Sequence, residues 1–305
     1  MRKIKLGKSN LEVPVVALGC MRLTNLDLKT AEKHIKTSLE YGINFFDHAD
    51  IYGGGKCEEF FSEAIQMTPA IREKLILQSK CGIRPGMFDF SKEHILDSVD
   101  NILSRLKTDY LDILLLHRPD ALVEPEEVAE AFNVLKNNGK VRHFGVSNQK
   151  PMQIELLQKY IEMPIITNQL QLSITNSTMI SNGLNVNMEI DSSIDRDGSI
   201  LDYCRLNEIT IQPWSPFQYG FFEGSFLNNK KFPELNEIID NIAEKYQVSN
   251  TTIAIAWILR HPAKMQPIIG TMNTQRLIDA AKASDITLTR EEWYKIFTAA
   301  GNKLP

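Results

Sequence analysis

The chain has 305 residues, of which 43% are hydrophobic and 24% are charged, a composition typical of a globular protein with a large core. Its formal charge of −4 gives no broad positive surface for phosphate backbones, so we expect no nucleic-acid partner. Apolar runs such as 113–116 are far shorter than the roughly 20 residues of a membrane-spanning helix, so we expect no membrane insertion.

The start of the chain does not have the pattern of a secretion signal. Residues 1–6 carry several charges, and Gly7, Lys8 and Ser9 interrupt any apolar segment. We therefore expect a cytoplasmic location. The four cysteines lack the short spacings of zinc sites, so we expect reduced, packed thiols and no metal site.

In chain order, the first predicted elements are two short strands, 4–6 and 11–13, and the turn 7–10 makes them a hairpin. Behind them, short apolar runs alternate with amphipathic segments along almost the whole chain. The eight predicted strands are 15–19, 44–47, 75–80, 111–117, 143–147, 165–169, 210–213 and 267–270. The predicted helices include 30–41, 92–106, 125–137, 152–160, 234–246 and 274–283.

Some helix boundaries have a physical cause in the sequence. Ser91 precedes a charged first turn, Pro125 suits a first helical position, and Asn138-Gly139 is typical of a helix end. The segment 173–199 is rich in Asn, Ser and Asp, and we expect it to form a long surface loop or short helices.

Alternating strands and helices predict parallel strands, because parallel neighbours need a long, right-handed connection. Two α/β architectures fit: an open doubly wound sheet and a closed (β/α)8 TIM barrel. The glycines at 53–55 have neither the spacing nor the position of a dinucleotide-binding GxGxxG motif. Eight strands without a linker favour a single barrel domain over 1–305, with the N-terminal hairpin as a plug for its bottom.

Active sites of such barrels lie at the C-terminal strand ends and in the loops behind them. The second predicted strand ends at Asp47 and is followed by Tyr52, the third ends at Lys80, and the fourth ends at His117. Taken alone, each residue has an ordinary structural explanation as a turn cap or packing contact. Because three consecutive strands end this way, we expect the four side chains to meet at one mouth.

This set of side chains suits carbonyl reduction. Hydride addition leaves negative charge on the carbonyl oxygen, so the reaction needs a proton donor and a polar pocket. Tyr52 can donate the proton, and an ammonium at Lys80 would lower its pKa from about 10. Asp47 would keep Lys80 protonated, and a neutral His117 would orient the carbonyl or help to relay the proton.

Three segments of the chain resemble the aldo-keto reductase superfamily in order and spacing. They are Gly42-Ile43-Asn44-Phe45-Phe46-Asp47-His48-Ala49-Asp50-Ile51-Tyr52-Gly53, Leu77-Gln78-Ser79-Lys80 and Asp112-Ile113-Leu114-Leu115-Leu116-His117. The resemblance extends from about Leu6 to Ala283. It implies a barrel with an N-terminal hairpin, a C-terminal helix and a nicotinamide cofactor extended across the mouth, so the missing GxGxxG motif is expected.

The resemblance also implies a role for each of the four residues. Tyr52 matches the general acid, Lys80 the residue that adjusts its pKa, Asp47 the partner of the lysine, and His117 the substrate-orienting residue. The implied activity is that of an NADPH-dependent oxidoreductase that reduces an aldehyde or ketone, a small-molecule carbonyl substrate, to the alcohol.

A cofactor site follows from the same resemblance. Residues matching Ser147, Asn148 and Gln169 hydrogen-bond the nicotinamide carboxamide, which suits amide side chains because they both donate and accept. Trp214 matches an aromatic residue that lies against the nicotinamide face. The further positions are Ser215, Pro216, Phe217, Gly270, Thr271, Arg276 and Asp279.

The choice between NADPH and NADH rests mainly on Arg276. This residue matches one that binds the adenosine 2′-phosphate, and a planar guanidinium suits a phosphate, so NADPH is the expected cofactor. Three positions depart from the family pattern. Gly270 stands where some members have a phosphate-binding lysine, and Asp279-Ala280 replaces a Glu-Asn pair, so NADH use stays open.

Two other functions stay open. A metal-dependent barrel hydrolase would draw its ligands from Asp47, His48, Asp50, His117 and Asp120, but no His-x-His pair ends the first strand. A regulatory subunit that binds cofactor with little turnover is known within the resembled family, beside channel proteins, although no added N-terminal segment is visible here.

Specificity in such barrels comes from loops, here 81–90, 118–124 and 219–229. Their aromatic residues predict an apolar pocket for aldehydes or ketones. These residues are Phe88, Phe90, Tyr219, Phe221 and Phe222. The compound, the oligomeric state and the physiological direction are left undetermined.

Overall fold

Eight parallel strands form the centre of the computed structural model, which describes residues 1–304. The strands are β3 (Ala17–Gly19), β4 (Phe45–Asp47), β5 (Ile76–Cys81), β8 (Leu111–Leu116), β9 (Val141–Ser147), β10 (Ile165–Gln171), β11 (Thr210–Trp214) and β14 (Ile268–Ile269). Their order in the sheet is β11-β10-β9-β8-β5-β4-β3-β14. The order follows the chain from β3 to β11, as the strand–helix alternation predicts.

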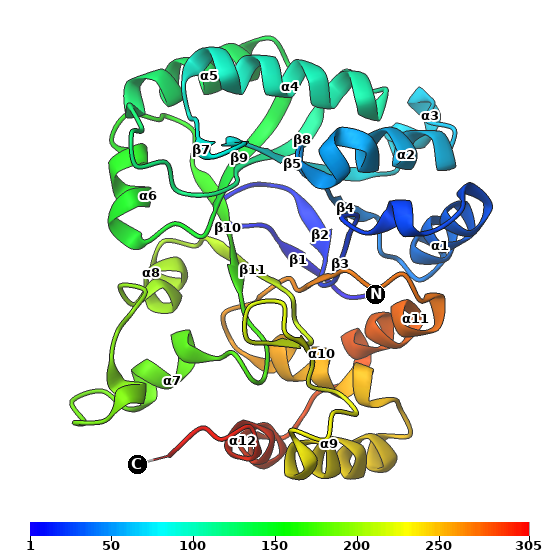
Figure 1. The fold of residues 1–305 in the computed structure, drawn as a ribbon, viewed down its shortest axis with the longest axis vertical. Coiled ribbons are helices and arrows are strands. Elements are labelled where there is room, and N and C mark those ends of the chain that lie inside the picture. Colours follow the sequence, from blue (N-terminus) through cyan, green and yellow to red (C-terminus); the bar gives the residue numbers. More distant parts are fainter. Residues whose placement is uncertain (305) are drawn as a thin grey trace.

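The two edge strands of this sheet, β11 and β14, come together and close it. Gln266, just before β14, donates its backbone N–H to Ile211 O of β11 over 3.0 Å. Its side-chain oxygen accepts a hydrogen bond of 2.8 Å from Gln212 Nε2. The sheet is therefore nearly closed into a barrel, and the prediction of a (β/α)8 TIM barrel is confirmed (Figure 1).

Helices surround the strands (Figure 1). Those that follow the barrel strands are α1 (Leu28–Glu40), α2 (Lys56–Ala64), α4 (Lys92–Leu106), α5 (Pro125–Asn137), α6 (Pro151–Gln158), α8 (Ile200–Leu206), α10 (Asn250–Arg260) and α11 (Thr274–Lys282). Additional helices are α3 (Pro69–Arg72), α7 (Thr178–Leu184), α9 (Pro233–Tyr246) and α12 (Arg290–Ala299). Within residues 1–304, none of the helices combines the length and the apolar character that a membrane span requires.

Local sequence signals set several of these boundaries. Ser91 accepts a hydrogen bond from His94 N and caps α4, and Pro125 is the first residue of α5. Gly139, with φ of 72°, ends the turn behind α5. These two helices have the predicted bounds. The segment 173–199 contains α7 and a short 3₁₀ turn, Asp191–Ser193, in agreement with the expected short helices.

The N-terminal hairpin, β1 (Lys3–Lys5) with β2 (Glu12–Pro14), closes the N-terminal end of the barrel. Leu6 and Val13 are fully buried in one apolar cluster with barrel residues such as Phe45 and Ile113. Gly7 has φ of +53°, and a Cβ there would lie 2.2 Å from Ile166 O, so only glycine permits this close approach. The predicted plug is therefore present, and the open end of the barrel is the C-terminal mouth.

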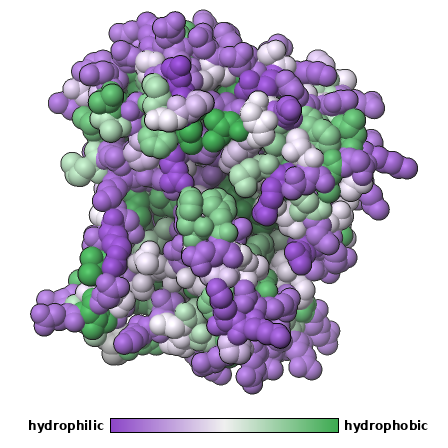
Figure 2. All heavy atoms as spheres, viewed as in Figure 1, coloured by the Kyte–Doolittle hydropathy of each residue, from purple (hydrophilic) through white to green (hydrophobic). Residues whose placement is uncertain are grey.

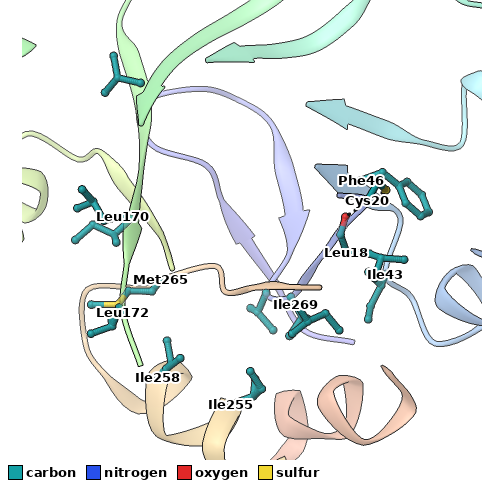
Figure 3. Packing of buried hydrophobic residues seen from close by; sticks show 14 of the residues in the cluster. Leu18, Cys20, Ile43, Phe46, Leu170, Leu172, Ile255, Ile258, Met265 and Ile269 are labelled. Carbon is teal, nitrogen blue, oxygen red and sulfur yellow. Dashed lines mark hydrogen bonds between the residues drawn. The ribbon is translucent and has the colours of Figure 1, made fainter. Parts of the chain in front are cut away.

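A second and larger apolar cluster lies between the strands and the helices. Figure 3 shows Leu18 and Phe46 from neighbouring strands on one side of it, and Ile255 and Ile258 of α10 on another. Two short hairpins extend from the strand ends at the mouth. They are β6 (Ile83–Arg84) with β7 (Met87–Phe88) and β12 (Gln218–Tyr219) with β13 (Gly224–Ser225).

Candidate active site

The C-terminal strand ends surround a cavity of about 900 Å³. Figure 2 shows a hollow near the centre of this face, with hydrophobic side chains beside it. Most of the predicted site residues line the cavity: Asp47, Tyr52, His117, Ser147, Asn148, Gln169, Trp214, Ser215, Pro216, Phe217, Gly270, Thr271 and Arg276. Lys80 is buried directly behind Asp47 and Tyr52, and Asp279 is not among the lining residues.

Asp47 and Lys80 form a buried ion pair at the ends of β4 and β5. Lys80 Nζ lies 2.8 Å from Asp47 Oδ2, and both side chains are almost completely buried. The other carboxylate oxygen of Asp47 accepts hydrogen bonds from Gln78 Nε2 at 2.6 Å and Gln169 Nε2 at 3.1 Å. Asp47 is thus held at both oxygens, as a buried carboxylate requires.

The lysine ammonium has three protons, and the site provides three acceptors. Besides Asp47, Lys80 Nζ donates to His48 O over 2.7 Å and to the Tyr52 hydroxyl over 3.1 Å. Since the Tyr52 oxygen accepts this hydrogen bond, its own proton is free to be donated elsewhere. Because Tyr52 lines the cavity, that proton is available to a molecule bound there.

A glycine turn presents Tyr52 at the mouth. Gly53, Gly54 and Gly55 have φ of 60°, 65° and 91°, a left-handed conformation that residues with a Cβ rarely adopt. A Cβ on Gly55 would also lie 3.0 Å from Arg105 Cδ of α4. The three glycines are therefore needed for the turn that follows Tyr52, and they have no part in a dinucleotide-binding motif.

The pKa of Tyr52 differs from the expectation from sequence. Burial raises the pKa of the phenol above its ordinary value and outweighs the lowering effect of Lys80, while Asp47 raises it further. The prediction that Lys80 would lower this pKa was therefore wrong in its net direction. The lysine acts in the expected sense, but Asp47 offsets its charge, and the phenol keeps its proton at neutral pH.

Lys80 is charged in this site, whereas His117 is neutral. Burial by itself lowers the pKa of Lys80, but attraction to Asp47 and to Tyr52 outweighs burial, so the pKa is raised and the ammonium persists. Burial lowers the pKa of His117 well below its usual value, and the charges of Lys80 and Arg118 add to this effect. His117 is therefore a neutral imidazole, with its ring edge-on to Tyr52 at 5.9 Å.

Amide and hydroxyl groups line the next part of the cavity. Asn148 Nδ2 donates to Ser147 Oγ over 2.7 Å, and Asn148 Oδ1 accepts from Trp214 Nε1 over 3.2 Å. Ser215 has φ of 53°, a strained value for a residue other than glycine. Such strain at a cavity wall is typical of a ligand-binding loop, and the predicted positions Ser215, Pro216 and Phe217 all line this cavity.

At the opposite side of the cavity, Arg276 is exposed at the start of α11, where Asn273 caps the helix. Arg22, which sequence reasoning missed, also lines the cavity. Its Nη2 atom lies 3.2 Å from the point where a Cβ of Gly270 would be, so its guanidinium lies close to where a lysine at 270 would begin. The sequence could have indicated Arg22, because it lies three residues after the end of β3, in a loop at the mouth.

The Asp279-Ala280 pair, which matches the family positions near the adenosine, is not among the residues that line this cavity. The Asp279 carboxylate accepts a hydrogen bond of 3.0 Å from Gln275 Nε2 and lies 3.9 Å from Lys282 Nζ. Ala280 is fully buried between helices. The structure therefore does not bring the Asp279 side chain to the wall, while Arg276 and Arg22 supply two guanidinium groups there.

The five aromatic residues predicted to form the substrate pocket lie in different surroundings. Phe222 lines the cavity and stacks on Trp214 at a centroid distance of 5.8 Å. Phe90 is buried in the core, and Tyr219 packs edge-on against Phe232. Phe88 and Phe221 are exposed and do not line the cavity. Of the five predicted aromatic residues, Phe222 alone is in the described wall.

The candidate ligands of the metal-hydrolase alternative do not form one set. Asp47 is occupied by Lys80, and the His48 ring packs edge-on against Phe61. Asp120 accepts backbone hydrogen bonds from Phe90 and Leu122. In the part of the chain that the structure describes, no group of three or more His, Cys, Asp or Glu side chains is arranged to hold a metal ion.

The nearly closed barrel and the aspartate, lysine, tyrosine and histidine at its mouth fit an NAD(P)H-dependent oxidoreductase. Residues 15–300 match the sequence model described as the Aldo/keto reductase family. The chain belongs to that family, and its general activity is the reduction of carbonyl compounds.

Individual relatives agree with this assignment. The chain is 36% identical to the oxidoreductase YcsN of Bacillus subtilis over 98% of both chains. It is 32% identical to the 6-dehydroglucose reductase of Agrobacterium fabrum over 99% of both chains. The thermostable aldo-keto reductase Tm1743, solved with the inhibitor epalrestat, has a similar structure, with a TM-score of 0.77 and 26% identity over 98% of this chain and 100% of that chain.

Proposed function

We propose that this protein reduces an aldehyde or ketone to the alcohol with NADPH, and that Tyr52 is the general acid. The observation that carries the proposal is the hydrogen-bonded set behind the cavity wall, in which Lys80 donates both to Asp47 and to the Tyr52 hydroxyl. The cofactor, when bound, supplies the hydride that adds to the carbonyl carbon. The chain supplies the proton.

Each side chain of the set has a role in that proton transfer. Tyr52 keeps its proton in the resting site because burial raises its pKa. As negative charge develops on the substrate oxygen, Tyr52 donates this proton, and Lys80 stabilises the phenolate that remains. Asp47 holds Lys80 charged and in place. The neutral His117 lies beside the Tyr52 ring, where it can orient the carbonyl oxygen.

The cavity wall has suitable groups for each end of a nicotinamide cofactor. Ser147 and Asn148 supply hydroxyl and amide groups for a carboxamide, and Trp214 supplies an aromatic face. Arg276 and Arg22 supply guanidinium groups for phosphates. The NADPH preference rests on Arg276, with Arg22 in the region where some family members have a lysine. Asp279 stays a weaker candidate because its carboxylate contacts Gln275.

The experiment that tests this function has two stages. The purified protein is first titrated with NADPH and with NADH, with quenching of tryptophan fluorescence as the readout, because Trp214 lies in the cavity wall. Turnover is then followed at the absorbance band of the reduced nicotinamide with aldehydes, ketones and diketones. The panel includes a 6-aldehyde sugar, since a relative is named a 6-dehydroglucose reductase.

The outcomes separate the competing functions. NADPH binding with turnover of at least one class of carbonyl compound supports the proposal. Tight NADPH binding without turnover of any compound would favour the regulatory alternative. Binding of neither cofactor would contradict the proposed function altogether.

A further inference from the structure

Three guanidinium groups line the cavity: those of Arg22, Arg118 and Arg276. None of them takes part in an ion pair within residues 1–304. Asp47 is the one carboxylate among the described lining residues, and Lys80 already neutralises it. The cavity therefore has a positive charge that the protein itself does not balance.

The three arginines are on opposite sides of the barrel. Arg22 follows β3, and Arg276 follows β14, and these two strands are neighbours in the sheet. Arg118 follows β8, which is four strands from β14 in the eight-stranded order, so it lies across the mouth. Two arginines are thus grouped at the proposed phosphate end, and Arg118 is left at the catalytic end.

The surroundings of Arg118 place it beside the reacting groups. It follows His117 directly, and its Cζ atom lies 5.8 Å from the centre of the Trp214 ring. The ring of the preceding residue, His117, lies edge-on to Tyr52 at 5.9 Å, so Arg118 is next in the chain to a group that contacts the proposed acid. Burial lowers the pKa of Arg118. A guanidinium keeps its charge at neutral pH in spite of such a change.

The acidic residue nearest to Arg118 in sequence does not compensate its charge. Asp120 Oδ2 accepts from Phe90 N at 2.9 Å, and Asp120 Oδ1 accepts from Leu122 N at 2.8 Å. Both oxygens hold the loop instead. Arg118 is therefore a half-buried cation that faces the cavity with unused N–H donors in the described structure.

We infer that Arg118 binds a carboxylate on the substrate, so that the preferred substrates are oxo acids, compounds with a carbonyl group and a carboxylate. A planar guanidinium donates two parallel hydrogen bonds to a carboxylate, which fixes the carbonyl group relative to Tyr52. A phosphate dianion would need a second cation at this end, and a neutral sugar would leave the charge of Arg118 without a counter-ion. The inference rests on the proposed reduction at Tyr52.

Matched pairs of substrates test this inference. 4-Oxobutanoate is compared with its methyl ester, and 4-formylbenzoate with its methyl ester, so that the members of each pair differ in charge and in one methyl group. We expect kcat/KM of the wild-type protein to be about 10-fold or more higher for the acid, because hydrogen bonds between charged groups add this much discrimination. The preference should weaken with added salt.

Variants identify the residue responsible. Arg118→Ala should lower kcat/KM for the acids by about 10- to 100-fold and change that for the esters less than about 3-fold. Arg118→Lys should restore part of the preference, since it keeps the charge but loses the planar pair of donors. Arg84→Ala is the matched control, because Arg84 is a half-exposed arginine paired with Asp89 outside this cavity.

The failures of the two proposals can be told apart. If the esters are reduced and the acids are not preferred, or if Arg118→Ala leaves the preference intact, the oxo-acid inference is overturned and the proposed function stands. A wild-type preference for a neutral sugar aldehyde over every acid overturns it in the same way. If no compound of the whole carbonyl panel is reduced, acids and esters included, the proposed reduction itself fails. Turnover of the esters by Arg118→Ala shows that this variant is folded.

Discussion

The two ends of the barrel each contain a buried carboxylate paired with a cation, but they differ in how the surrounding groups are satisfied. At the bottom, Asp112 of β8 accepts from Arg72 Nη2 at 2.7 Å, from Arg142 Nη1 at 3.0 Å and from Leu77 N at 2.9 Å. The other donors of Arg72 bind the Thr108 hydroxyl and two backbone oxygens. Both arginines stack on Tyr110 at 3.8 Å.

At the mouth, the Asp47–Lys80 pair has an equally complete set of partners, but the groups around it do not. The Tyr52 hydroxyl proton is free and faces the cavity, and His117 Nδ1 has no hydrogen-bond partner among the described residues. A buried ion pair is therefore weak evidence for a site. The informative feature is a polar group that keeps hydrogen-bonding capacity towards a cavity, which the bottom network lacks.

The largest expected effect belongs to the mouth. Tyr52→Phe removes the proton donor without removing a cofactor contact, so we expect kcat to fall by about 10³-fold. Cofactor titration should give a dissociation constant for NADPH within a factor of about 2 of the wild-type value, since binding energy is unaffected. Wild-type turnover by this variant would contradict the assignment of Tyr52 as the acid.

The bottom network should affect stability and leave catalysis unchanged. Asp112→Ala leaves Arg72 buried without its partner, so we expect the free energy of unfolding to fall by about 3 kcal/mol. Urea denaturation measures this loss, and kcat at a temperature where the variant is folded should stay near the wild-type value. Glu32→Ala is the control, because its pair with Lys36 is exposed and should contribute less than about 1 kcal/mol. A large loss of kcat in Asp112→Ala would remove the distinction between the two ends.

A third prediction concerns the other side of the mouth. Arg276→Ala should raise the dissociation constant for NADPH by about 10- to 30-fold, because one charge-assisted pair with a phosphate is lost. The constant for NADH should change less than about 3-fold, since NADH has no 2′-phosphate. Fluorescence titration with both cofactors measures the difference. Equal effects on the two cofactors would show that Arg276 does not distinguish them.

Much of the fold was predictable from the sequence, and the exceptions have physical causes. Helices with an amphipathic period, such as α4 and α5, were predicted with their bounds. Helix α10 was not predicted, because its residues from Thr251 to Leu259 are all buried and show no amphipathic period. The first strand begins at Ala17, two residues later than predicted, because Val15 N donates to Arg2 O beside the hairpin.

For the site, the four predicted side chains at the strand ends do meet at one mouth, with Lys80 behind the cavity wall, because parallel strands bring their C-terminal ends together. Arg22 was missed, and Arg118 was predicted only as the first residue of the specificity loop 118–124. The absence of an ionic partner for either arginine becomes visible only in the folded chain. The net direction of the Tyr52 pKa was also beyond sequence reasoning. It depends on the balance between burial and Lys80, and burial is a property of the folded chain.

The smallest expected effect concerns Asp50, a carboxylate near the mouth that has no cation paired with it among the described residues. Asp50, directly behind the mouth, has an oxygen without a hydrogen-bond partner in the described structure, and burial together with the charge of Glu58 raises its pKa from 3.8 to about 7. Between pH 4 and pH 7, the unfolded chain loses this proton and the folded chain retains it, so the contribution of Asp50 to stability falls over that range and is constant above it.

Asp50→Asn should therefore be more stable than the wild type at pH 8, by about 1 kcal/mol, and equally stable near pH 4. This difference is smaller than a fully dry carboxylate would give, because Asp50 is partly exposed and Arg105 is near. Urea denaturation of both proteins at several pH values measures it, and a difference independent of pH would show that Asp50 is already ionised in the folded protein.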